Sequence, residues 1–281
     1  EIFSSSTIML SGESYPFTVT ASYFYSNIFG FELKAEDNMG NSVGEIILER
    51  RKQLQEQYGI TTFEKNKSVL EAADLIVISV KPQNLVEIFT DLKGTFKDQH
   101  TVISIVAGAN INTLKTGFNH SKIIRVMPNM PAQIGSGMTV WTASSTVNQE
   151  HLGMTKRLAE LLGKQLYVEE EKYIDMATAL SASGPAYVFL FIEALIEAGV
   201  YIGMPRDMAS TLVRQTVWGS SKLVMDTGIH PAELRNAVTS PGGTTAEALL
   251  ALEENEFRAG LINAVDAAYG KAMLLGGSDN S

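Results

Sequence analysis

The chain of 281 residues contains no cysteine, which excludes disulfide bonds, thiolate nucleophiles and cysteine zinc sites. Its four histidines show no His-x3-His spacing, so we expect no metal site. No run of five basic residues occurs and the net charge is −9, which argues against nucleic acid or an anionic membrane as a partner. An uninterrupted apolar run of about 20 residues, the length of a membrane span, is also missing. The sequence opens without the basic leader of a secretory signal, and we therefore expect a cytoplasmic protein.

Short apolar runs rich in β-branched residues follow one another in the first half of the chain: LIVISV (75–80), TVISIV (101–106) and KIIRVM (122–127). Each is apolar on both faces, as a strand buried between two layers must be. The segments between them have helical spacing, and strand–helix–strand repeats of this length build a parallel sheet with crossover helices. MTVWTA (138–143) and QLYV (165–168) predict two further strands.

After about residue 171 the strand pattern disappears and the remaining segments favour helix. Several of these segments are apolar nearly all round, so other helices must bury them, and in a region of this size a partner chain is the best cover. The apolar helices expected at 185–203 and 206–226 fit such a dimer. We therefore predict an α/β domain at residues 1–171 and an all-helical domain at residues 172–281. The second domain is expected to form a homodimer or a larger homo-oligomer.

Residues 237–254, AVTSPGGTTAEALLALEE, place a proline and two glycines directly before an amphipathic helix. Pro241 ends the preceding helix, and Gly242 and Gly243 permit backbone angles closed to other residues. Thr244 and the glutamate three residues later have the spacing of a capping box. Free N–H groups and hydroxyls at such a helix N-terminus suit a carboxylate or a phosphate. Taken alone, the segment also fits the more common case of an ordinary turn between two helices.

Turn residues also follow the predicted strands in SVKPQ (79–83), SIVAGA (104–109) and RVMPNMPAQIGSGMT (125–139). Ligands of open parallel sheets bind beyond the carboxyl ends of the strands. Together with the segment at 237–254, these motifs closely resemble the pyrroline-5-carboxylate reductase family over roughly residues 48–276. The most specific part is AELRNAVTSPGGTTAEALLALEE, which is similar to the family's signature segment almost position for position.

The resemblance implies a Rossmann-like domain followed by a helical dimerisation domain, and reduction of 1-pyrroline-5-carboxylate to L-proline by hydride from NADPH or NADH. It also implies that Thr245 is the catalytic residue, with its hydroxyl near the imine nitrogen. The implied substrate-binding residues are Glu171, Ser240, Gly243, Thr244 and Thr245. The implied cofactor-binding residues are Asn66, Val80, Lys81, Pro82, Ala107, Gly108 and Asn129. No histidine or lysine is placed as a general acid, so we expect the proton to come from solvent or with a protonated substrate.

Residues 1–45 depart from the family, which opens on a hydrophobic strand running into G-x-G-x-x-G or G-x-G-x-x-A. This motif does not occur in the sequence. The segment is either not the native family sequence, for instance after a shifted reading frame, or a divergence that binds the cofactor differently or not at all. Two other functions stay open: a non-catalytic homologue that binds a small acid or a protein partner, and a β-hydroxyacid-type dehydrogenase, whose lysine-bearing helix is not found.

Overall fold

A computed structural model describes residues 6–10, 42–45, 52–53, 55–56, 61–71 and 73–276, the first two ranges by their backbone only. Contacts divide the chain into two compact units, Glu1–Ala182 with Ala268–Ser281, and Ser183–Ala267. The predicted domain boundary between residues 171 and 172 stays a prediction. Apart from two short strands, the question raised by residues 1–45 lies outside the described residues.

The first unit contains an eight-stranded sheet with the order β3-β2-β1-β4-β5-β6-β7-β8. The strands are β1 (Ser6–Leu10), β2 (Ser42–Glu45), β3 (Thr61–Phe63), β4 (Leu75–Ser79), β5 (Thr101–Ser104), β6 (Ile123–Met127), β7 (Gly137–Ala143) and β8 (Gly163–Tyr167). The strands predicted from the apolar runs are confirmed as β4 to β8, and β4, β5 and β6 are parallel neighbours.

The sheet is mostly parallel but not parallel throughout. β1 is antiparallel to both of its neighbours, β2 and β4, and β7 is antiparallel to β6. For β7 the length of the connection gives the reason. Residues 128–136 alone separate it from β6, which is fewer than the dozen or so that a parallel crossover requires.

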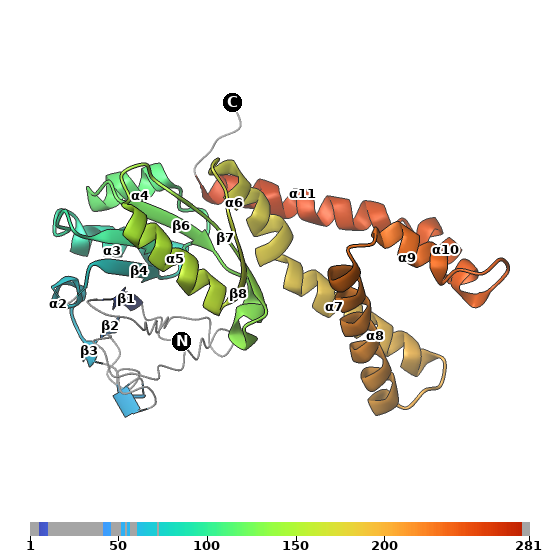
Figure 1. Cartoon of the computed structure of the whole chain (residues 1–281). Coiled ribbons are helices and arrows are strands. Elements are labelled where there is room, and N and C mark those ends of the chain that lie inside the picture. Colours follow the sequence, from blue (N-terminus) through green and yellow to red (C-terminus); the bar gives the residue numbers. More distant parts are fainter. Residues whose placement is uncertain are drawn as a thin grey trace. The chain divides into compact units, whose positions relative to one another are not determined.

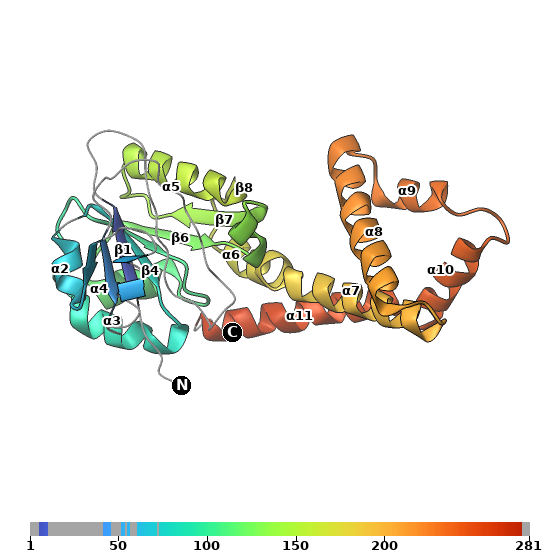
Figure 2. The ribbon, with the colours of Figure 1, turned by 90° about the horizontal axis from the view of Figure 1, so that it is seen from below.

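Helices cover both faces of this sheet, with α3 and α4 on one face and α5 on the other (Figure 1 and Figure 2). The elements are α2 (Asn66–Leu70), the 3-10 turn η1 (Pro82–Asn84), α3 (Leu85–Leu92), α4 (Ile111–Phe118), the 3-10 turn η2 (Met130–Ile134), α5 (Gln149–Leu161) and α6 (Lys172–Ala177), which a π-turn (Thr178–Ala182) follows. Alternation along β4 separates the two cores. Ile76 and Ile78 pack with α3 and α4, whereas Leu75 and Val77 pack with Trp141 of β7 and with α5.

The second unit is helical, as predicted from its sequence. It contains α7 (Gly184–Tyr201), α8 (Arg206–Thr227), α9 (Pro231–Ala237), α10 (Thr244–Glu254) and the first part of α11 (Phe257–Leu275), whose carboxyl end groups with the first unit. The hairpin of α7 and α8 is tight at Gly199, where an added Cβ would lie 2.9 Å from the Cβ of Ala209. α7 has no buried residue in the single chain, and Phe189 and Leu190 are more than half exposed. Within the part of the chain that the structure describes, one copy therefore leaves the apolar helix α7 uncovered.

Histidines gather around the start of β5. The Nδ1 of His100 accepts a hydrogen bond from the Lys97 N–H (3.0 Å), and the Nε2 of His120 donates to the carbonyl of His100 (2.8 Å). The Nδ1 of His151 pairs with the hydroxyl of Thr101 (2.7 Å). Burial lowers the pKa of all three imidazoles. Folding therefore favours the neutral form of these side chains.

We expect the free energy of unfolding to fall as the pH is lowered from about 7.5 to 5.5. A histidine whose pKa is lowered by folding is protonated at a higher pH in the unfolded chain, near its ordinary value of about 6.5, so acid favours unfolding. Urea unfolding at both pH values measures the loss. His151→Asn removes one titrating group while keeping a polar partner for the Thr101 hydroxyl, and should lose less stability than the wild type. An equal loss of stability in the variant and the wild type would show that the lowered pKa of His151 does not contribute to the pH dependence.

Candidate active site

The predicted cofactor residues, Asn66 excepted, follow neighbouring parallel strands. Lys81 precedes η1 directly after β4, the loop with Gly108 follows β5, and Asn129 precedes η2 directly after β6. Because the carboxyl ends of parallel strands meet at one edge of a sheet, the structure brings these residues to the same edge. Asn66 begins α2. It is buried, and its Nδ2 donates to the Asp91 carboxylate on α3 (3.0 Å).

The loop at residues 105–110 after β5 contains two backbone N–H groups without an acceptor in the described part of the chain. The Ser104 hydroxyl accepts a hydrogen bond from the Val106 N–H (3.3 Å), and the Ala109 N–H donates to the Val106 carbonyl (3.3 Å). Gly108 adopts a left-handed conformation, with φ +76°. Among the described residues, no acceptor bonds the N–H groups of Ala107 and Gly108. These two donors can therefore serve a ligand at the carboxyl edge of the sheet.

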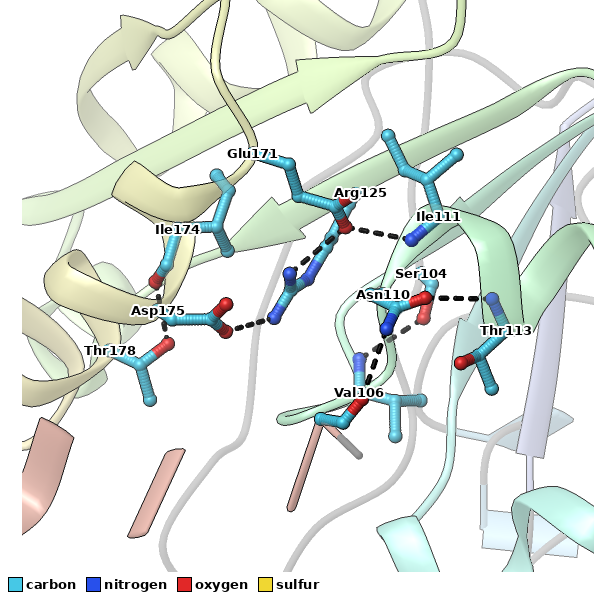
Figure 3. Close-up of polar contacts among 11 residues, drawn as sticks. Ser104, Val106, Asn110, Ile111, Thr113, Arg125, Glu171, Ile174, Asp175 and Thr178 are labelled. Atoms are coloured by element: carbon cyan, nitrogen blue, oxygen red, sulfur yellow. Dashed lines mark hydrogen bonds and ion pairs between the residues drawn. The ribbon is translucent and has the colours of Figure 1, made fainter. Parts of the chain in front are cut away.

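A buried ion pair network lies beside this loop (Figure 3). Arg125 on β6 has a side chain that is 1% exposed, and its Nη1 and Nη2 contact Glu171 Oε1 (3.0 Å) and Asp175 Oδ1 (2.5 Å). Glu171 Oε1 also accepts a hydrogen bond from the N–H of Ile111, the first residue of α4 (2.7 Å). Glu171, the predicted substrate residue, thus already has an arginine and a backbone N–H as partners. Its role toward the substrate stays a prediction.

Asn129 joins three segments of the first unit. Its Oδ1 accepts a hydrogen bond from the N–H of Met138 on β7 (2.8 Å), and its Nδ2 donates to the carbonyl of Ser181 in the π-turn (3.2 Å). The amide is therefore used on both sides by the protein itself. Its predicted cofactor contact remains a prediction. Since the Nδ2 also lies 3.4 Å from the Ser181 hydroxyl, the second lone pair of the Oδ1 is the position of this amide that no described partner uses.

The predicted carboxylate loop belongs to the second unit and contains a hydrogen-bonded turn. The Gly243 N–H donates to the Ser240 carbonyl (3.0 Å), and Gly242 has φ +65°. Proline at the second position and a left-handed glycine at the third are typical of a type II turn. A Cβ on Gly243 would meet the Ser240 hydroxyl, so a larger residue there would require this side chain to rotate away.

The helix that follows this turn, α10, begins differently from the prediction. Its N-cap is Gly243, and no side chain caps it, so the capping box assigned to Thr244 is wrong. The turn places Thr244 already inside the helix, one position too late to act as the cap. Among the described residues, no acceptor bonds the N–H groups of Thr244 and Thr245. The donors expected at this helix N-terminus are thus available.

Sequence reasoning missed several residues that form side-chain contacts at the carboxyl edge of the sheet in the first unit. Arg125, Asn110 and Asp175 were not singled out. A signal for Arg125 exists, because it is the charged residue in the middle of the otherwise apolar run KIIRVM. A buried charge requires a partner, and acidic residues follow at 169–171 and 175. The pairing itself needs the fold.

Residues 171–275 match the family model described as pyrroline-5-carboxylate reductase dimerisation, and residues 41–108 match one described as NADP oxidoreductase, coenzyme F420-dependent. The first unit thus contains an NADP-binding domain. The pyrroline-5-carboxylate reductase of Synechocystis is 40% identical over 234 residues, which are 83% of this chain and 87% of that protein. The reductase of Escherichia coli is 39% identical over 223 residues, 79% of this chain and 82% of that protein.

Solved structures agree with these matches. The crystal structure of pyrroline carboxylate reductase from Plasmodium falciparum with NADP bound has a TM-score of 0.73 at 35% identity and covers 77% of this chain and 82% of that one. The 1-pyrroline-5-carboxylate reductase of Streptococcus pyogenes has a TM-score of 0.74 at 35% identity and covers 80% and 85%. By identity, coverage and fold, this chain belongs to the pyrroline-5-carboxylate reductase family.

Proposed function

We propose that this chain reduces 1-pyrroline-5-carboxylate to L-proline with NADPH as the hydride donor, the last step of proline biosynthesis. The curated relatives at about 40% identity are named for this reaction. The observation that carries the proposal in this chain is the turn at residues 240–245, where two unpaired N–H groups and three hydroxyls stand at the start of α10. Such donors complement the carboxylate of the substrate.

The described residues fit a nicotinamide dinucleotide. The N–H groups of Ala107 and Gly108 have no protein acceptor, and Lys81 supplies a cation after the neighbouring strand. Unpaired donors and a cation at the carboxyl edge of a parallel sheet suit phosphate and ribose oxygens. We assign the cofactor to the sequence-predicted set: Asn66, Val80, Lys81, Pro82, Ala107, Gly108 and Asn129. NADPH is preferred to NADH in the proposal because a related structure contains NADP.

The reaction needs little acid–base catalysis by side chains of the protein. When bound, the nicotinamide supplies a hydride to the imine carbon, and the ring nitrogen keeps or gains one proton, giving the secondary amine of proline. Ser240, Gly243 and Thr244 hold the substrate carboxylate, Glu171 lines the site, and the Thr245 hydroxyl hydrogen-bonds the ring nitrogen. The chain thus contributes chiefly by orienting the substrate. The proton comes from solvent or arrives with a protonated substrate.

The helical unit is proposed to form a homodimer, on which larger assemblies can build. The stretch Lys172–Tyr201 is long and apolar enough to span a membrane by length and composition. It lies within the segment that matches the dimerisation model, and most of its large apolar side chains, Ile174 excepted, are at least partly exposed in the single chain. A second copy covers such a face without lipid. We therefore keep a cytoplasmic location, without membrane or nucleic acid partners, as part of the proposal.

NADPH oxidation by the dimeric fraction, started with 1-pyrroline-5-carboxylate, tests the proposed function. We expect turnover with NADPH, and less efficient turnover with NADH. A folded dimer that binds NADPH without oxidising it would favour a non-catalytic homologue instead. Activity on 3-hydroxy acids in its place would favour the dehydrogenase alternative.

Thr245→Ala is expected to lower kcat by about 10- to 100-fold, because one hydrogen bond to a charged ring nitrogen is worth about 1.5–3 kcal/mol. Thr245→Ser retains the hydroxyl and should keep most of the activity. Thr211→Ala removes a threonine hydroxyl that only bonds the carbonyl of Asp207 on α8, and serves as the matched control. Unchanged kinetics in Thr245→Ala would remove this residue from the mechanism.

A further inference from the structure

The loop after β5 is tied to a segment more than 160 residues later in the chain. The Nδ2 of Asn110 donates to the carbonyl of Gly276, directly after the end of α11 (3.0 Å). The Oδ1 of the same side chain accepts from the N–H of Thr113 (2.7 Å) and so caps α4 (Figure 3). One amide therefore both begins α4 and holds the carboxyl end of α11.

Close backbone packing accompanies this hydrogen bond. A Cβ added to Gly108 would lie 2.5 Å from the Cβ and 2.8 Å from the carbonyl carbon of Leu275. A Cβ on Gly276 would lie 3.3 Å from the Gly108 carbonyl oxygen. Such distances leave no room for a side chain between the loop and the last turn of α11. This contact joins the end of α11 to the first unit, with which the residues from Ala268 onward group.

The protein itself uses two of the backbone donors that follow the loop. At the start of α4, the Ile111 N–H goes to the Glu171 carboxylate and the Thr113 N–H to Asn110. A ligand at the carboxyl edge therefore cannot use these two groups. Inside the loop, the N–H groups of Ala107 and Gly108 have no acceptor among the described residues, and their direction depends on the shape of the loop between Ser104 and Asn110. Whatever fixes that shape controls what the two donors can bind.

We propose that Asn110 is a positioning residue for the dinucleotide. By holding the Gly276 carbonyl it fixes the end of α11 against Gly108, and so keeps the loop in the shape in which Ala107 and Gly108 present their N–H groups. Asn110 itself does not touch the dinucleotide. The inference rests on the proposed cofactor site, and it makes the carboxyl end of α11 a part of that site.

Asn110→Ser separates the two functions of this side chain. A serine hydroxyl caps a helix about as well as an asparagine, but it is too short to reach Gly276. Asn148→Ser is the matched control, since Asn148 caps α5 through its Oδ1 (2.7 Å to the His151 N–H) and has no described partner for its Nδ2. Neither substitution changes the net charge, so neither alters the attraction of the anionic dinucleotide.

The measurements are the Kd for NADPH by calorimetry without substrate, amide hydrogen exchange in residues 105–110 and 268–276, and the KM for 1-pyrroline-5-carboxylate. In Asn110→Ser we expect a Kd raised about three- to tenfold, the effect of losing one hydrogen bond. Exchange should be faster in both segments, and the substrate KM should stay within about twofold. Asn148→Ser should leave all three unchanged.

A Kd equal to that of the wild type, despite faster exchange in the loop, would overturn the positioning role and leave Asn110 as a structural tie only. An equal rise in the Kd for NADPH in Asn148→Ser would overturn it too, since this result would point to general destabilisation. A wild-type chain that does not bind NADPH would be a different failure. It would reject the proposed cofactor site itself, together with this inference.

Discussion

Arg125→Met is expected to lower the free energy of unfolding by about 3 kcal/mol, at the lower end of the cost of removing one partner from a buried ion pair. The guanidinium is 1% exposed and contacts two carboxylates, Glu171 and Asp175. Methionine fills a similar volume but leaves both carboxylates facing each other without a cation. Because Glu171 is 31% and Asp175 15% exposed, water relieves part of the cost. Urea unfolding of the variant and the wild type measures the difference.

A second ion pair in the same chain supplies the control. Arg206 on α8 bonds Glu197 on α7 through both Nη atoms (2.8 and 3.1 Å), but more than half of each side chain is exposed. Arg206→Met should therefore change the stability far less, because water and salt screen an exposed pair. Combining Arg125→Met with Glu171→Gln and Asp175→Asn should restore much of the lost stability. Equal effects of the two arginine substitutions would show that burial does not govern the energetics of Arg125.

The central part of the fold could be predicted from the sequence because its pattern is strong. The runs at 75–80, 101–106 and 122–127 are apolar on both faces, which leaves little choice but buried parallel strands, and β4, β5 and β6 are those strands. The helical second half was equally clear. In contrast, β3 and α2 are short, with three and five residues, and were not predicted. Elements this short carry too little periodicity to be recognised.

In the candidate site, too, local features could be predicted from the sequence and long-range contacts could not. The turn at 240–243 could be located from proline and glycine alone, because their backbone restrictions act locally. The capping of α10 was predicted one residue out of place, since the sequence does not show which residue of the turn is the first with helical angles. Contacts such as Asn110 with Gly276 and Arg125 with Asp175 join segments far apart in the chain. No local pattern encodes them, and only the folded sheet brings them together.

Gly163→Ala is expected to lower the free energy of unfolding by about 3–5 kcal/mol, which is exceptional for the addition of one methyl group. Gly163 begins β8 with φ +134°, a conformation closed to other residues. A Cβ there would collide with the carbonyl oxygen of Gly137 and lie 2.5 Å from its backbone N. Both atoms belong to the paired strand β7, and the Gly137 N–H already donates to the Leu162 carbonyl (2.8 Å). Neither strand can move away without breaking the pairing at this end of the sheet.

Gly135→Ala separates backbone strain from collision, because Gly135 also has positive φ (+67°) but meets nothing within 4 Å. It should cost about 1–2 kcal/mol, the ordinary penalty for a left-handed alanine. The difference between the two variants in urea unfolding then measures the collision of Gly163 with β7. If the two substitutions cost the same, the close approach of β7 and β8 at Gly137 does not constrain the sheet. A larger loss in Gly163→Ala shows that β8, which leads directly to Glu171 and the ion pair network, depends on this glycine for its pairing.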